Sequence, residues 1–270
     1  MQSAIILDKS FLQGSKKARI HELAQTHRLL VSDALFYELL TASEPGRSRC
    51  FSKFPPIDNP VDLVDHIGTL MRLEIDSHTP AGKPSTHCEK LRFQFNPCMV
   101  NPEYELPDEG RHSVNEQTAQ LRSEVLSFMD RCSSIDSFFP KILVGSQAQQ
   151  VQAREEAERA IAEPSALIPF YASLEPPPGQ QPLPSASIVT EKWALYRWLQ
   201  VQLLFSLDLY VRYRGVIPEN ISPTMYEKIE HDVLDAQVMM LGCLEGAFAT
   251  REKKLIRWWN LICPDGTLYV

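Results

Sequence analysis

The first residues of the chain alternate between continuous apolar runs and apolar residues at helical spacing. Residues 4–7 are all apolar, and the run ends at Asp8. Such a run is typical of a strand that is covered on both faces, as in a parallel sheet. The segments that follow are predicted as a helix, a strand and a second helix, at residues 11–26, 29–31 and 34–41. The order strand, helix, strand, helix indicates an α/β unit with parallel strands.

The end of the chain repeats this alternation. A helix predicted from residue 223 carries Asp232 and Asp235, which share one helix face because they are three residues apart. Gly246 is a plausible helix end. The short apolar run 247–249 predicts a strand, which is followed by Thr250 and Glu252. A short basic helix at 253–259 and a last strand at 267–270 complete the pattern.

Between these two ends the pattern becomes helical and rich in loops. Helices are predicted at 61–76, 113–139, 147–163 and 188–214, and a proline-rich loop at 164–187. We therefore predict an α/β fold in which residues 1–42 and 223–270 form the core. Residues 43–222 are expected to form a large, mainly helical insertion packed on that core.

Composition narrows the functional classes. The 270 residues carry a formal net charge of −7, which argues against a protein that coats nucleic acid by bulk positive charge. No apolar stretch approaches the roughly 20 residues of a membrane span. The six cysteines form no Cys-x-x-Cys pair, and the N-terminus has no basic region before its short apolar run. We expect a cytoplasmic protein with reduced thiols and no membrane partner.

Five acidic residues lie at predicted strand ends or on the helices beside them: Asp8, Glu38, Asp232, Asp235 and Glu252. Open α/β sheets bind ligands at the carboxyl ends of their strands. Glu38 has apolar neighbours on both sides, and a carboxylate in such a setting is costly unless it is paired or bound to metal. Clustered carboxylates raise each other's pKa, and a divalent cation removes that penalty. Mg²⁺ and Mn²⁺ prefer oxygen ligands. Taken singly, Asp8 could merely end a strand and Glu38 could be a solvated helix position.

Basic residues accompany both groups of acids. Lys9 follows Asp8, and Lys253 begins the basic helix near the end of the chain. Ammonium groups beside a metal site could hold the phosphates of a substrate, and ordinary surface charge is the alternative explanation.

These motifs, taken in order, resemble the PIN domain family. The resemblance rests on Asp8 with Ser10, Glu38 in the helix after the second strand, Asp235 before Gly246, and Thr250 followed by Glu252. It implies a three-layer fold with a short, mainly parallel central sheet. It also implies a metal-dependent nuclease, most often a ribonuclease, that uses a metal-activated water to hydrolyse a phosphodiester.

The resemblance also implies roles for particular residues. Asp8, Glu38 and Asp235 would hold Mg²⁺ or Mn²⁺, with Asp232 and Glu252 supporting them or holding a second ion. Ser10, Thr250, Lys9 and Lys253 would contact the substrate, which we expect to be nucleic acid and RNA foremost. Further partners would be a regulatory protein or a second copy of the chain. Two features depart from the family pattern: the last acid is glutamate where aspartate is usual, and the helical middle has no recognised counterpart.

Two other functions fit the same residues. The α/β core could be a catalytically inactive scaffold whose helical insertion contacts a partner protein, and loss of metal affinity would distinguish this case. A phosphatase on a similar sheet is disfavoured, because no phosphate-cradling glycine loop or Asp-x-Asp pair follows the first strand.

Overall fold

The computed structural model describes residues 2–88, 94–176, 181–216 and 221–270. The chain divides into two units, which are described separately. The first consists of Met1–Leu70, Ala81–Gln117 and Gln237–Val270, and the second consists of Met71–Pro80 and Thr118–Ala236.

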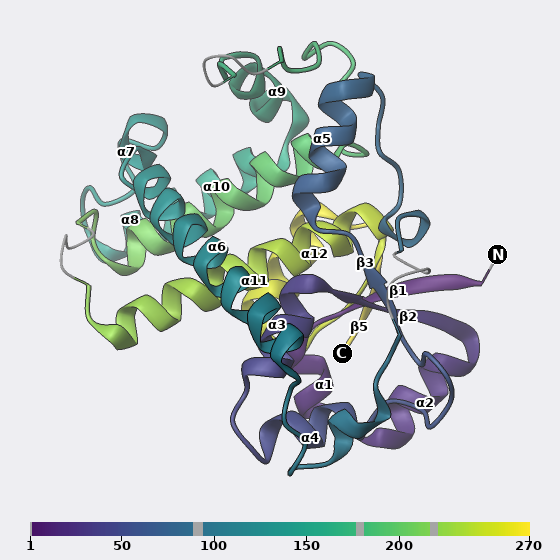
Figure 1. The fold of residues 1–270 in the computed structure, drawn as a ribbon. Helices are drawn as coiled ribbons and strands as arrows, with labels where there is room; N and C mark the ends of the chain where they lie inside the picture. Colours follow the sequence, from purple (N-terminus) through teal and green to yellow (C-terminus); the bar gives the residue numbers. More distant parts are fainter. Residues whose placement is uncertain (1, 89–93, 177–180, 217–220) are drawn as a thin grey trace. The chain divides into compact units, whose positions relative to one another are not determined.

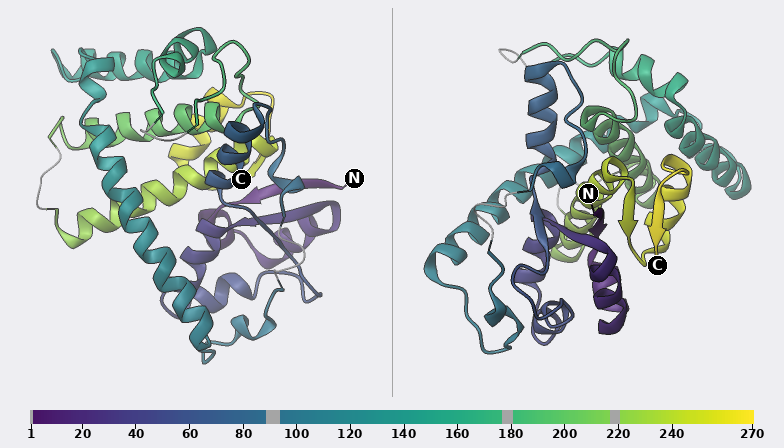
Figure 2. Two further views of the ribbon diagram at one scale, coloured as in Figure 1. Left: turned by 45° about the horizontal axis from the view of Figure 1, so that its top comes forward. Right: turned by 90° about the vertical axis from the view of Figure 1, so that its right-hand side faces the viewer.

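The first unit is built on one sheet whose five described strands all run parallel in the order β3-β2-β1-β4-β5. The strands span Ser3–Leu7 (β1), His27–Ser32 (β2), Asp62–Val64 (β3), Ala247–Ala249 (β4) and Thr267–Tyr269 (β5). Strands from the two ends of the chain lie side by side, because Leu7 of β1 pairs with Ala249 of β4 (Figure 2). The expected α/β fold with a parallel sheet is therefore confirmed; strands from both ends of the chain form this sheet together with β3 from its middle.

Helices connect these strands. They are α1 (Lys9–Gly14), α2 (Lys17–Thr26), α3 (Asp33–Thr41), α4 (Gly46–Phe51) and α12 (Lys253–Ile262), with short 3-10 turns at Pro84–Thr86 and Pro97–Val100. Right-handed crossovers with this strand order place the helices after β1 on one face and the helix after β4 on the other. Figure 1 shows α1 and α2 on the opposite side of the strands from α12.

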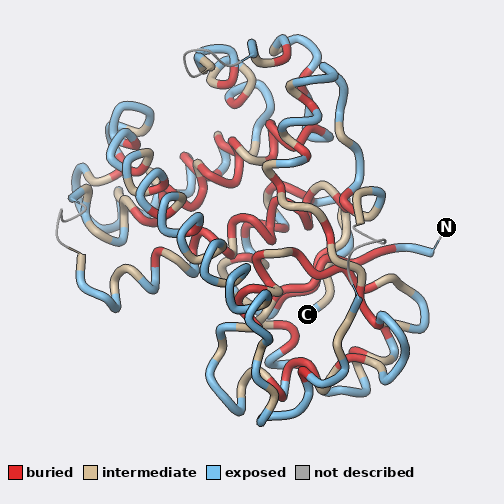
Figure 3. The backbone as a smooth tube through the Cα atoms, viewed as in Figure 1, coloured by how far each residue is buried: buried red, intermediate tan, exposed pale blue. Residues whose placement is uncertain are grey.

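The centre of this sheet is buried, and residues 4–7 of β1 are all apolar. Ile5, Ile6 and Leu7 are completely buried, as is Phe248 of β4. Burial of each such side chain stabilises the fold by about 1.5–3 kcal/mol. The buried segments of the backbone in Figure 3 follow these strands. β1 is covered on both faces, as its continuous apolar run predicted.

Two local features fix the end of β2 and the start of β4. The Ser32 hydroxyl accepts a hydrogen bond from the Leu35 backbone N–H at 3.0 Å, so it caps α3. Gly246 has φ of +78°, the left-handed conformation that glycine adopts without strain at a helix end. Both boundaries agree with the sequence-based expectation.

The second unit is helical. Its helices are α7 (Ile135–Phe138), α8 (Gln147–Ala162), α9 (Pro164–Ala172) and α10 (Ala194–Arg212); α5 (Ile67–Ser77), α6 (Asp108–Cys132) and α11 (Pro223–Glu245) have residues in both units. The core packs around Trp193, Tyr196 and Leu199 of the α10 region. The buried Glu74 carboxylate accepts hydrogen bonds from the Ala194 and Leu195 N–H groups at 2.7 and 2.9 Å, which satisfies the first turn of α10.

Several predicted boundaries were wrong. The predicted helix 61–76 contains β3 before α5 begins, because an edge strand of three residues fits the same apolar spacing. The predicted loop 164–187 contains α9, and its residues 177–180 lie outside the described part. The predicted helix 11–26 is divided into α1 and α2, and the predicted helix 113–139 into α6 and α7. β3 also lies within the segment 43–222 that was predicted as the insertion. Among the described residues, no helix combines the length and the apolarity that crossing a membrane requires.

Candidate functional site

Asp8 lies where the two ends of the chain meet. It follows β1 directly and caps the first turn of α1, and its backbone N–H donates to the Ala249 carbonyl of β4 at 2.9 Å. Its side chain is only 2% exposed. Because β1 and β4 are parallel, the residues after them meet at the same edge of the sheet. This edge is where ligands bind in open α/β sheets.

Two hydroxyl groups hold the Asp8 carboxylate. Thr250 donates from Oγ1 to Asp8 Oδ2 at 2.8 Å, and the Ser10 hydroxyl donates to the same oxygen. The hydroxyls of Ser10 and Thr250 are 3.2 Å apart. The backbone N–H groups of Arg251 and Glu252 donate to them at 2.9 and 3.1 Å. Residues some 240 positions apart thus form one polar cluster.

The charge of Asp8 is poorly compensated within its unit. Burial raises the pKa of Asp8, and the hydrogen bonds from Ser10 and Thr250 oppose that rise. Its hydrogen-bond donors are hydroxyl and backbone N–H groups, and over the part of the chain that the structure describes no ion pair involves it. A buried carboxylate without a counter-ion is costly to ionise, and either a proton or a cation relieves that cost.

Glu38 has a cationic neighbour from the same unit. Its carboxylate, 7% exposed, lies 3.3 Å from Lys9 Nζ. Glu38 comes from α3 and Lys9 from the start of α1, one residue after Asp8. The expectation that Glu38 is costly unless paired or metal-bound is thus met by an ion pair. The metal role of Glu38 and the substrate role of Lys9 stay predictions.

Glu252 and Lys253 lie beside the same cluster. Glu252 directly precedes α12, and its side chain makes no capping hydrogen bond; its backbone N–H is the group that donates to Thr250. Lys253 is exposed at the first position of the helix. Further along α12, Lys254 Nζ and the Arg257 guanidinium lie 5.6 and 5.7 Å from the centre of the Trp258 ring. Lys253, Lys254 and Arg257 thus lie on one short helix that begins beside the Asp8 cluster. The roles assigned to Glu252 and Lys253 stay predictions.

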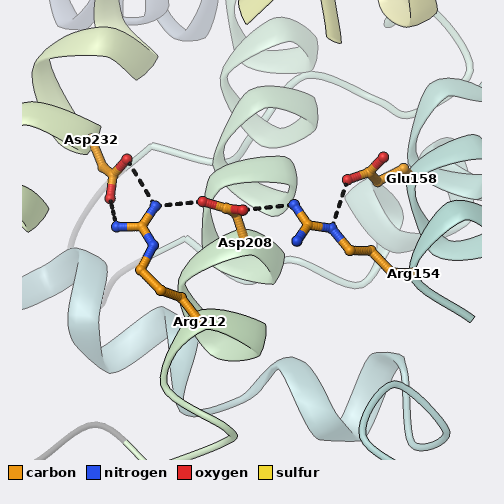
Figure 4. Close-up of polar contacts among 5 residues, drawn as sticks. All are labelled: Arg154, Glu158, Asp208, Arg212 and Asp232. Atoms are coloured by element: carbon orange, nitrogen blue, oxygen red, sulfur yellow. Dashed lines mark hydrogen bonds and ion pairs between the residues drawn. The ribbon is translucent and has the colours of Figure 1, made fainter. Parts of the chain in front are cut away.

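Asp232 and Asp235 belong to the second unit. Asp232, 5% exposed, accepts hydrogen bonds from Arg212 at 2.7 and 3.3 Å. Figure 4 shows how the network continues: Arg212 contacts Asp208, which accepts from Arg154 at 2.6 Å. At the end of the network Arg154 donates to Glu158 at 3.1 Å. Asp235 is half-buried on the next turn of α11.

This network already compensates the charge of Asp232. Burial lowers the pKa of Arg212, but hydrogen bonds and charges from Asp232 and Asp208 outweigh that effect and raise it. An aspartate that is held by a guanidinium has its charge compensated without metal. Asp232 is therefore explained by packing in the second unit, and its supporting metal role stays a prediction.

The donor set around Asp8 suits a hard cation. Carboxylate and hydroxyl oxygens are the ligands that Mg²⁺ and Mn²⁺ prefer, and Mg²⁺ keeps several waters when one or two carboxylates hold it. Within the described ranges no three His, Cys, Asp or Glu side chains are grouped so that they could hold a metal ion. A site centred on Asp8 would thus use few protein ligands and rely on bound water.

The sequence did not predict the basic partners of two of these acids, which are Lys9 for Glu38 and Arg212 for Asp232. The pairing of Lys9 with Glu38 joins residues 29 apart, and that of Arg212 with Asp232 joins residues 20 apart. The one available signal was the spacing of Asp208 and Arg212, four residues apart and hence on one helix face.

Comparison with known proteins adds no relative. No protein-family model, no curated protein and no solved structure matches the chain.

Proposed function

We propose that the chain is a divalent-metal-dependent nuclease of the PIN-like kind, and that it cleaves RNA. The observation that carries this proposal is Asp8: a buried carboxylate at the carboxyl end of the central strand, held by two hydroxyls and without an ion pair among the described residues. The proposal is supported by the strand order and by the meeting of Asp8, Ser10 and Thr250 from opposite ends of the chain. The resemblance of the sequence implied that meeting.

The residues of the first unit that would hold the cation are Asp8 first, with Glu38 and Glu252 in support; Asp232 and Asp235 belong to the second unit and are left out of this proposal. A bound Mg²⁺ or Mn²⁺ would supply a water of lowered pKa and would neutralise charge on a phosphodiester. Ser10 and Thr250 fix the orientation of Asp8 by hydrogen bonds, so that its second oxygen has a defined position. Lys9 and Lys253 are the ammonium groups nearest in sequence to that cluster and would bind phosphate oxygens.

The positive end of α12 fits a polyanionic substrate despite the net charge of −7. Lys253, Lys254 and Arg257 lie on one short helix that begins beside the Asp8 cluster. A local basic patch steers a nucleic acid by its phosphates, and its effect decreases as salt is added. Cleavage is therefore expected to slow at high ionic strength.

Cleavage of RNA with a matched pair of variants tests the proposal. Asp8→Asn keeps the size and the hydrogen-bond acceptor of the side chain but removes its charge. The control is Glu245→Gln, a buried acid of the same unit that accepts from Ser85 at 2.9 and 3.0 Å and precedes the amino end of β4. With Mn²⁺ present, Asp8→Asn should lower the cleavage rate by more than about 100-fold. Loss of a residue that only supports a metal ligand lowers activity by at most about 100-fold. Glu245→Gln should cleave at nearly the wild-type rate. Equal cleavage by the wild type and Asp8→Asn would refute the proposal.

One observation favours a second candidate, a catalytically inactive binding module. Lys9 already supplies a positive charge to Glu38, which a metal would otherwise provide. If Lys9 has replaced a metal, the wild type should bind no Mn²⁺, and Lys9→Met should create a Mn²⁺ site. If Lys9 assists a nuclease, Lys9→Met should leave Mn²⁺ bound and weaken the binding of RNA.

A further inference from the structure

A cavity in the second unit combines apolar walls with one cation. Its volume is about 210 Å³, and Phe138, Phe170, Trp198 and Leu203 form apolar parts of its lining. Arg131 and Gln202 are polar groups in the same lining. A second hollow of about 170 Å³ shares Phe138, Phe170 and Leu203 with it, so the two hollows adjoin at these residues. Pockets with apolar walls and a few placed polar groups are the usual form of small-molecule sites.

Arg131 is the unusual member of this lining. Its guanidinium donates to Gln202 Oε1 at 3.0 Å and lies 5.6 Å from the centre of the Trp198 ring and 6.0 Å from that of Phe128. Its Nε atom is buried and has no hydrogen-bond partner. Across the residues that the structure covers, no carboxylate forms an ion pair with it. Leaving a buried donor unsatisfied is costly, so an acceptor is expected.

Two other arginines of this unit form ion pairs of the kind that Arg131 lacks among the described residues. Arg154 and Arg212, in the same unit, each contact two carboxylates. Burial lowers the pKa of Arg131, and the coulombic effects of Cys132, Glu124 and Asp130 only partly offset it. The pocket thus carries a guanidinium whose charge the described side chains do not pair.

We propose that this pocket binds a small organic acid, one carboxylate on an apolar body, with Arg131 recognising the carboxylate. A carboxylate matches the single charge and the planar donor fork of a guanidinium. The apolar body would lie against Phe138, Phe170 and Leu203, and the adjoining hollow leaves space for a longer tail. A phosphate group is a poorer fit, because it brings more charge to a pocket with a single cation and aromatic walls.

Access to the pocket is consistent with this role. Phe138 is 44% exposed and forms an edge-to-face pair with Phe170, with ring centres 4.5 Å apart. Both rings line both hollows. An exposed aromatic side chain at such a position is explained when a ligand covers it.

Calorimetric titration with octanoate and octanol tests the proposal on the full-length protein. The two probes share a chain length, and only octanoate carries a carboxylate. Octanoate should bind saturably with one molecule per chain, at least tenfold more tightly than octanol. Arg131→Gln should weaken octanoate binding at least tenfold and leave octanol binding unchanged. Arg122→Gln, an exposed arginine on the same helix, is the control for net charge and should bind as the wild type does.

Three results would overturn the proposal. They are equal affinity for octanoate and octanol, equal weakening by Arg122→Gln and Arg131→Gln, and no saturable octanoate binding below its micelle concentration. If Arg131→Gln does not fold, the comparison of the two probes on the wild type still decides. A second readout is the ¹H–¹⁵N signal of the Arg131 Nε–H group, which should shift with octanoate and not with octanol. The proposal is independent of nuclease activity.

Discussion

The two units satisfy their buried acids by different means. In the second unit Asp232 and Glu158 are bonded to arginines, and Glu74 is bonded to the first N–H groups of α10. In the first unit Glu38 has Lys9, while Asp8 has only hydroxyl and backbone donors among the described residues. The charges of Asp232 and Glu158 are thus balanced within the second unit and serve packing. The cation that we propose for Asp8 would supply the positive charge that its hydroxyl and backbone donors do not.

The largest stability effect should come from breaking the balanced network. Arg212→Ala leaves Asp232 and Asp208 without their shared guanidinium. Breaking a buried pair costs about 3–5 kcal/mol, and the partial exposure of Arg212 reduces this to about 2 kcal/mol. Urea denaturation would measure the loss. Arg111→Ala, which removes an exposed ion pair with Asp108, should cost less than about 1 kcal/mol. Equal losses would show that the network does not stabilise the unit.

A smaller effect should follow from removing one hydroxyl at Asp8. Thr250→Val deletes the 2.8 Å hydrogen bond and should destabilise the fold by about 1–2 kcal/mol at neutral pH. That hydrogen bond favours the ionised form, so its loss raises the pKa of Asp8 further. A raised pKa in the folded state means that stability is greatest when Asp8 is protonated and is lost as pH rises.

The pH dependence is therefore the sharper test of Thr250→Val. Its destabilisation should shrink as pH falls through the raised pKa of Asp8, because the protonated carboxyl depends less on the hydroxyl. Unfolding free energies of the wild type and the variant, measured from pH 8 down to about pH 4, would show this convergence. A difference that stays constant over that range would mean that Asp8 is not the group that titrates.

The smallest effect should come from the Lys9–Glu38 pair. Lys9 is partly exposed, and loss of such a pair is worth about 1 kcal/mol or less. Lys9→Met should therefore change stability little, and its effect should diminish further in high salt. Thermal unfolding at two salt concentrations would measure this. A loss as large as that of Arg212→Ala would show that Glu38 depends on Lys9 and would weaken its assignment as a metal ligand.

Apolar patterning was sufficient to predict the centre of the sheet and the edge strand β5, but not the other edge strand, β3. Residues 4–7 and 247–249 have no polar member, so a strand buried on both faces was the natural prediction. β3 is half-buried over most of its length and only three residues long, and Val61, Leu63 and Val64 also fit a helical spacing. α9 was missed because its prolines and flanking loop outweighed its apolar length.

The candidate site was predictable in part for a similar reason. Asp8 and Thr250 directly follow two adjacent parallel strands, whose ends must meet, and Ser10 lies two residues after Asp8. The partners of Glu38 and Asp232 come from the packing of separate helices, which local sequence does not encode. Arg131 gave no signal in the sequence, because the missing acceptor at its Nε atom becomes visible only once its surroundings are known.

Titration of Mn²⁺, followed by electron paramagnetic resonance, tests most directly whether Asp8 holds a cation. At neutral pH the wild type and Glu245→Gln should each bind Mn²⁺ saturably, and Asp8→Asn should bind it more than about 100-fold more weakly. Asp232→Asn should retain binding, since Arg212 already compensates Asp232. Equal Mn²⁺ affinity in the wild type and Asp8→Asn would contradict the account.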